Sequence, residues 1–225
     1  MENSFHIRDF TIVIIANRHN PSILNPDFLK FNNIVPKDWE LKKAPICIEP
    51  FSEVAFKNNV NVRAEINKLT FFEKLSEKDP YHIEIDEIAK KYTEVLPHVD
   101  HLAVGLNFTG HISFENNPEG PKEYIMTTLI ANGPWCEYGE DRSASISFAF
   151  KLGRTQLNLT IKESTLNGEQ KGNLPILFFD SNFHKELAGS GREEKLKDLH
   201  EILSKWTEDF EEFKRVIENV FHREG

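Results

Sequence analysis

The chain has 225 residues, with 27 Lys and Arg against 36 Asp and Glu, and a formal net charge of −9 at pH 7. This acidity disfavours nonspecific binding to nucleic acids, which depends on Lys and Arg contacts to phosphates. The longest apolar run, at residues 10–16, is far shorter than the ~20 residues that a membrane-spanning helix needs. We therefore expect no membrane association.

Hydrophobic residues make up 39% of the chain and charged residues 28%, as is usual for a globular protein. The unusual residue is Phe, with 18 copies, so aromatic side chains are expected to dominate the core. The two cysteines, Cys47 and Cys136, form no CxxC motif and accompany no signal-peptide pattern. These features favour a reducing, cytoplasmic location.

The first half of the chain begins with a strand at residues 10–16, whose apolar and β-branched run is typical of a strand covered on both faces. A short helix opened by Asn25 and Pro26 is predicted in the connection that follows. Three strand-like runs come next, at residues 52–58, 60–66 and 68–74. A helix over 85–97, with Asp86 as its expected cap, closes this half.

The second half repeats this order. Residues 102–114 alternate apolar and small or polar side chains, which predicts a long strand, and Gly110 is expected to mark a bend or bulge in it. A helix is predicted over 121–133. Three further strand-like runs follow, at residues 143–152, 155–164 and 174–183. The first two are joined by a tight turn at Gly153 and Arg154.

A long helix is predicted at the end of the chain. Its apolar residues are spaced alternately three and four apart, and they are Leu196, Leu199, Leu203, Trp206, Phe210, Phe213, Ile217 and Val220. Such a seam forms either a core helix that lies across the sheet or a coiled coil that binds a partner. We expect its last turns, with Ile217, Val220 and Phe221, to extend past the sheet and bind a partner or a second copy.

The repeated order predicts an internal duplication. Two halves, residues 9–97 and 102–222, each read as strand, helical connection, three strands and helix. Trp39 and Trp135 fall at equivalent places in the two halves. We therefore predict one domain over residues 1–225, of the α+β class, with one curved antiparallel sheet, helices on one face and a long C-terminal helix. The two halves should superpose about a pseudo-twofold axis.

This order of elements resembles the saddle of the TATA-box-binding protein and, more loosely, the SecB-type export chaperones. The segments LNPDFL (24–29), VPKDW (35–39) and LPHVDH (96–101) are similar to those of an uncharacterised family of cyanobacteria and other bacteria. The resemblance implies a curved sheet and a bacterial source, but no activity. The nucleic-acid face of the saddle proteins is basic, whereas this chain is acidic.

One face of the predicted sheet carries few long charged side chains along the strand at 102–114. Such a face is either solvated or able to accept an extended partner segment. The residues that we expect to contact a partner there are Asn107, Thr109, His111, Asn158 and Thr160.

A second group of polar residues lies around the helix at 85–97, namely His82, Glu84, His98, Asp100 and His101. These residue types could bind a metal ion or carry acid–base chemistry. However, no HExxH motif or cysteine partner accompanies them, so a polar turn that bonds its own backbone explains them better. His19 and His111 occupy equivalent strand ends and are expected to be structural.

The sequence therefore predicts a non-enzymatic protein-binding module, such as an adaptor, a chaperone-like protein or a regulatory subunit. No catalytic residue, cofactor or metal is predicted. Two alternatives remain. One is a metal-dependent or acid–base hydrolase or nuclease that uses the group at 82–101, and the other is a small-ligand binder with a cleft between the halves.

Overall fold

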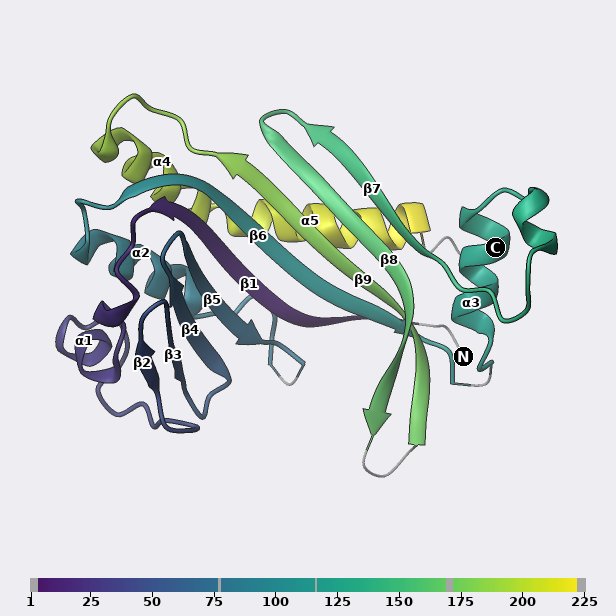
Figure 1. Cartoon of the computed structure of the whole chain (residues 1–225), viewed down its shortest axis with the longest axis horizontal. Helices are drawn as coiled ribbons and strands as arrows, with labels where there is room; N and C mark the ends of the chain where they lie inside the picture. The colour runs from purple at the N-terminus through teal and green to yellow at the C-terminus, as the bar shows by residue number, and fades with distance from the viewer. Residues whose placement is uncertain (1–3, 77, 116, 169–171, 222–225) are drawn as a thin grey trace.

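In the computed structural model, residues 4–76, 78–115, 117–168 and 172–221 are described. They form one open sheet of nine antiparallel strands in the order β2-β3-β4-β5-β1-β6-β9-β8-β7 (Figure 1). In chain order the strands are β1 (Phe5–Asn17), β2 (Ile46–Ile48), β3 (Phe51–Ala55), β4 (Val60–Glu65), β5 (Lys68–Lys74), β6 (Asp100–Ser113), β7 (Ser145–Leu152), β8 (Thr155–Gly168) and β9 (Gly172–Glu186). The prediction of an α+β fold with a curved antiparallel sheet is confirmed.

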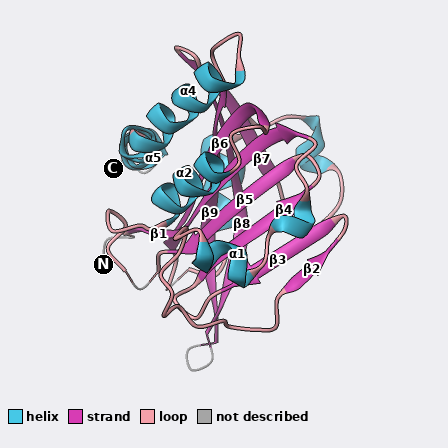
Figure 2. Ribbon diagram, turned by 90° about the vertical axis from the view of Figure 1, so that its left-hand side faces the viewer, coloured by secondary structure: helices cyan, strands magenta, loops and turns pink. Residues whose placement is uncertain are grey.

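Helices cover one face of this sheet (Figure 2). The α-helices are α1 (Pro26–Phe31), α2 (Ile85–Val95), α3 (Gly120–Tyr124), α4 (Arg192–Ser204) and α5 (Trp206–Val216). Single turns of 3-10 or π helix lie at 21–23, 125–129, 134–137 and 217–221. Among the described residues, no helix combines the length and the apolar character that crossing a membrane requires.

The strand order is the same on both sides of the boundary between β1 and β6. Moving outward from β1, the sheet continues with β5, β4 and β3, and moving outward from β6 it continues with β9, β8 and β7. In both halves the inner strand comes first in the chain and the three-stranded meander returns to it. This is the order that an internal duplication predicts. The superposition of the halves stays a prediction, and residue 222, the end of the second repeat, lies outside the described residues.

An aromatic cluster forms the centre of the core between the sheet and α5. Phe10 of β1 stacks on its cross-strand partner Phe108 of β6, with ring centroids 4.6 Å apart. Phe210 and Phe213 of α5 lie 5.4 and 5.9 Å from Phe108, and Trp206 lies 5.5 Å from Phe10. Burial of these large rings removes apolar surface from water and stabilises the packing of α5 on the sheet. Four of the phenylalanines thus pack together at the boundary between the two halves.

The terminal helix is interrupted, where the sequence predicts one long helix. It breaks at Lys205, between α4 and α5, and ends in a π turn at 217–221. Ile217 is 0% exposed and Phe221 is 6% exposed, so the expectation that they extend past the sheet to meet a partner is wrong. The side chain of Val220 lies outside the described part of the structure. Because the seam from Leu199 to Ile217 is buried, this helix is a core element.

Two local predictions also differ from the structure. Asp86 does not cap α2; instead the buried carboxylate of Glu73 accepts the backbone N–H groups of Glu84 (2.8 Å) and Ile85 (3.2 Å). The bulge expected at Gly110 lies opposite it, because β1 carries the extra residue between Ile7 and Asp9. Gly110 itself leaves room for a ring, since an added Cβ would lie 2.5 Å from the ring of Phe5.

Candidate functional site

The sheet face turned away from α2, α4 and α5, which we call the open face, carries three rows of side chains that extend from β1 toward the β7 edge. The first row, called the amide row, runs across five neighbouring strands. It consists of Thr11, Asn107, Asn182, Asn158 and Ala149. Neighbouring strands are about 4.8 Å apart, so the three asparagine amides lie side by side.

Hydrogen bonds fix the orientation of the amide row. Asn182 Nδ2 donates to Asn107 Oδ1 at 2.7 Å. Asn107 Nδ2 in turn donates to the carbonyl oxygens of Thr11 (3.0 Å) and Gly105 (3.2 Å). Gly105 is needed here, because a Cβ added to it would lie 2.7 Å from Asn182 Nδ2. Because position 105 has no side chain, the side-chain amide of Asn182 has room to reach Asn107.

The second row, called the hydroxyl row, lies two residues further along each strand. It consists of Asp9, Thr109, Asp180, Thr160 and Ser147. The Thr109 hydroxyl donates to Asp9 Oδ2 at 3.0 Å, and the hydroxyl oxygens of Ser147 and Thr160 lie 2.9 Å apart. This row therefore contains two hydrogen-bonded pairs of short side chains, with Asp180 between them.

The third row, called the ring row, contains aromatic and basic side chains. His6 and His111 are cross-strand partners whose rings stack with centroids 5.4 Å apart. Phe178 is the next residue in the row, and the Arg8 guanidinium carbon and Lys162 Nζ lie 5.6 and 5.3 Å from its ring centroid. These distances are those of cation–π contacts. The row therefore places two cations, Arg8 and Lys162, against the ring of Phe178.

Burial, with a smaller contribution from the nearby His6 and Arg8, lowers the pKa of His111 to about 4. His111 is therefore neutral near pH 7, and its Nδ1 atom is buried without a hydrogen-bond partner among the described residues. The carboxylates of Asp9 and Asp180 balance the cations Arg8 and Lys162. The three rows together, called the polar patch below, carry no net charge in a chain whose net charge is −9.

The structure brings together the five strand residues singled out from the sequence. Asn107, Thr109 and His111 lie on β6, and Asn158 and Thr160 lie on β8. The intervening strand β9 joins them through three residues that sequence reasoning missed, namely Phe178, Asp180 and Asn182. Their spacing of two residues within a strand-like run was the available signal. That these residues bind a partner stays a prediction.

The group at residues 82–101 does not form one site. His82 and Glu84 precede α2, whereas His98, Asp100 and His101 follow it, and a helix of this length separates its two ends by roughly 15 Å. Each member also has its own local surroundings. His82 Nδ1 lies 2.8 Å from Asp79 Oδ2, and Asp100 accepts from Lys195 Nζ and Asn17 Nδ2, both at 2.9 Å.

His101 differs from its neighbours because it is buried, at 2% exposure. It lies near His19, which is also 2% exposed and whose Nε2 is 3.0 Å from the hydroxyl oxygen of Tyr92. Burial lowers the pKa of both histidines to about 4, and repulsion from neighbouring histidines adds to it. His19 Nδ1 and His101 Nε2 have no hydrogen-bond partner among the described residues. Two neutral histidines in like surroundings do not make an acid and a base.

No group of three or more His, Cys, Asp or Glu side chains in the described residues is arranged to hold a metal ion. We expect protein purified without a histidine tag to contain no stoichiometric zinc or manganese. We also expect His98→Ala to change the free energy of unfolding by less than about 1 kcal/mol, because His98 is exposed in a turn. Elemental analysis and chemical denaturation measure these quantities. A stoichiometric metal that is lost in His98→Ala would contradict both expectations.

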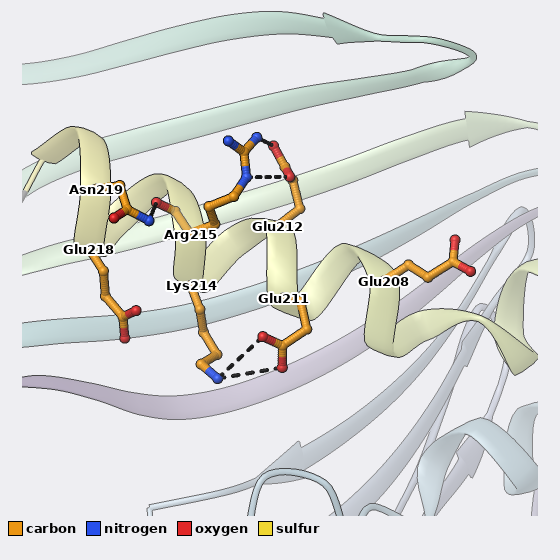
Figure 3. Close-up of a pocket in the computed structure, with 7 residues that line it drawn as sticks. All are labelled: Glu208, Glu211, Glu212, Lys214, Arg215, Glu218 and Asn219. Carbon is orange, nitrogen blue, oxygen red and sulfur yellow. Dashed lines mark hydrogen bonds and ion pairs between the residues drawn. The ribbon is translucent and has the colours of Figure 1, made fainter.

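Two surface depressions outside the polar patch differ from it in character. One follows the outer side of α5, where Lys214 pairs with Glu211 and Arg215 pairs with Glu212 (Figure 3). These are ion pairs within one helix, as on an ordinary solvated face. The other, of about 390 Å³, is lined by Trp135 and Arg142, with the Arg142 guanidinium carbon 6.0 Å from the Trp135 ring centroid. It lies within the second half rather than between the halves.

Comparison with known proteins adds no relative, since neither a protein-family model nor a curated protein matches this chain.

Proposed function

We propose that this protein is a non-enzymatic protein-binding module that holds an extended segment of a partner on the polar patch. The observation that carries the proposal is the placement of the patch. The helices pack against the opposite face of the sheet, and the patch combines amide, hydroxyl and aromatic side chains without net charge. Such side chains hydrogen-bond peptide groups and stack on apolar side chains without requiring a charged ligand.

The period of the patch fits an extended peptide. Along β9, Asn182, Asp180 and Phe178 point to the same face at steps of two residues. An extended partner that runs along the strands also repeats its side chains every two residues, at about 6.8 Å. Alternate side chains of that partner would meet the amide, hydroxyl and ring rows in turn. This match supports a protein segment as the ligand.

A binding role is proposed rather than a catalytic one, because of how the hydroxyl and imidazole groups of the patch are placed. The Thr109 hydroxyl donates to Asp9, and His111 is neutral and stacked on His6. Nucleophilic catalysis needs a nucleophile hydrogen-bonded to a base that a third group orients. None of the pairs in the patch has that arrangement.

The terminal helix has no part in this proposal, because Ile217 and Phe221 belong to the core. We place the protein in a reducing, cytoplasmic compartment. Its two cysteines are free and lie in β2 and in the turn before β7, at opposite edges of the sheet. They are therefore too far apart to form a disulfide within one chain.

The proposal is tested by selecting peptides from a random displayed library on the immobilised protein and measuring the affinity of the selected peptides. Thr160→Arg places a long side chain beside Asp180 in the hydroxyl row, and we expect it to weaken binding at least about tenfold, because the arginine covers the row on which the peptide would lie. Thr70→Arg is the matched control. Thr70 also lies on the open face, but on β5, four strands away from β8.

Thr70→Arg should leave the affinity unchanged, and both variants should keep the melting temperature of the native protein. Selected peptides whose affinity is the same for the native protein and Thr160→Arg would place the binding surface elsewhere. A library that yields no binding peptide would count against the proposed function itself.

A further inference from the structure

The two edges of the sheet differ in how well they are protected from pairing with another strand. At one edge, β2 is three residues long and lies between Pro45 and Pro50. Short strands and prolines are common devices against edge-to-edge association. At the other edge, β7 is eight residues long, contains no proline, and pairs with β8 in an unbroken register from Ser145 to Leu152.

The turn between β7 and β8 determines which backbone groups of β7 are free. Leu152 pairs with Thr155 across the two-residue turn Gly153-Arg154, and Gly153 has φ +60°. A glycine with positive φ in the first position is typical of a type II′ hairpin turn, whose flanking residues are hydrogen-bonded to each other. Because the pattern alternates along an antiparallel pair, Phe150, Phe148 and Ile146 also bond to β8. The outward-facing N–H and C=O groups belong to Ser145, Ser147, Ala149 and Lys151.

The side chains of β7 are compatible with another strand beside it. On the open face they are small or flexible, and Ser145, Ser147 and Ala149 are exposed. On the helix-covered face Phe148 and Phe150 are only half-buried, although Phe148 lies 5.3 Å from the Phe221 ring and 6.0 Å from the Phe150 ring. A neighbouring strand would bury the remaining apolar surface of these two rings.

We infer that β7 is a dimer interface, at which a second copy of this chain pairs antiparallel through its own β7. Two copies of the strand can pair about a twofold axis that passes between their Phe148 residues. In this register the opposite pairs are Phe148 with Phe148, Ser147 with Ala149, Ile146 with Phe150, and Ser145 with Lys151. The outward-facing residues then exchange roughly eight backbone hydrogen bonds, and the aromatic residues occupy the closer, non-hydrogen-bonded pairs.

The charge of the edge favours a second copy as the occupant. The chain has a net charge of −9, yet β7 carries no carboxylate, and its one charged residue, Lys151, lies opposite Ser145 rather than opposite itself. No like charges therefore face each other across the axis. An acidic chain can approach a copy of itself along this strand more easily than along the acidic outer side of α5.

Pairing through β7 also extends the open face. Ala149 and Ser147 are the last residues of the amide and hydroxyl rows, so the rows of one copy continue into those of the other across the axis. The inference does not rest on the proposed function, because the edge would pair whether or not the patch binds a peptide.

The test is sedimentation equilibrium of the full chain over a wide range of concentrations. We expect the native protein to be a dimer. Ala149→Pro removes an outward N–H group, and Ala149→Lys adds a like charge near the axis. Each should raise the dimer dissociation constant by at least about tenfold, through the loss of ladder hydrogen bonds or through repulsion. Ser164→Lys is the control, since Ser164 is exposed on β8 beyond the end of β7.

Amide hydrogen exchange gives an independent readout within the same strand. The amides of Ser147 and Ala149 should be protected in the native dimer and exchange quickly in Ala149→Lys, whereas the amide of Phe148 should be protected in both. If Ala149→Pro does not fold, Ala149→Lys decides alone. A native protein that is monomeric at every concentration, or a dimer that Ala149→Lys leaves intact, would overturn the inference.

Discussion

Replacing Phe210 by alanine is expected to lower the free energy of unfolding by about 3–5 kcal/mol, the usual range for a large aromatic residue removed from a core. Phe210 is 0% exposed and lies between three other rings, at 5.4 Å from Phe108, 5.8 Å from Trp206 and 5.4 Å from Tyr81. Its removal leaves a cavity between α5 and the centre of the sheet. Denaturant unfolding monitored by far-UV circular dichroism measures the change.

Phe31→Ala is the matched control, because Phe31 ends α1 and is 85% exposed. It should change the free energy of unfolding by no more than about 0.5 kcal/mol, as is usual for surface substitutions. Equal losses in the two variants would mean that α5 does not pack on the sheet through its aromatic residues.

The protein is expected to lose stability as the pH falls from about 6.5 to about 4. His19 and His101 have pKa values lowered to about 4 by burial, against 6.5 for an ordinary histidine. Between these values the unfolded chain binds protons that the folded chain does not, so protonation favours unfolding. The stabilisation is complete above pH 6.5 and is lost toward pH 4. A shift of this size corresponds to about 3 kcal/mol for one histidine.

The measurement is the free energy of unfolding as a function of pH, for the native protein and for His19→Gln with His101→Gln. The stability of the double variant should depend less steeply on pH between 4 and 6.5, because glutamine binds no proton in this range. His82→Gln, at an exposed position, should reproduce the native pH profile. A double variant with the native slope would show that other groups cause the acid sensitivity.

The strands could be predicted from the sequence because each carries a strong local pattern. Alternation in β6, the tight turn at Gly153 and the order of the two meanders specified the antiparallel sheet without knowledge of its contacts. Short β2 was not predicted, since three residues between two prolines carry too little pattern. Long-range contacts determine that strand, and local sequence does not report them.

The ends of the helices and the burial of the histidines also depend on tertiary contacts that local sequence does not report. Asp86 has the residue type of a cap, but the carboxylate of Glu73, at the end of β5, accepts the first N–H groups of α2 instead. The apolar spacing of the terminal helix indicates a helix with one apolar face, but its break at Lys205 has no proline or glycine that predicts it. The residue types around His101 predict a polar turn, whereas the bulge beside Ala16 turns the side chain into the core.

The candidate site was partly predictable. The small and polar face of β6 was visible as an alternation, and Asn107, Thr109 and His111 followed from it. That β9 would insert between β6 and β8, and so complete the three rows, depended on the strand order alone. The sequence pattern predicts a surface of small polar side chains, whereas the strand order determines which residues form it.

The central claim is that the polar patch holds an extended partner segment. Its most direct test is titration of the isotope-labelled protein with a selected peptide while the asparagine side-chain amide signals are followed by NMR. We predict that the side-chain amides of Asn107, Asn158 and Asn182 and the backbone amide of Thr160 shift first and saturate together. Shifts confined to residues of α4 and α5, with these asparagine signals unchanged at saturation, would contradict the claim.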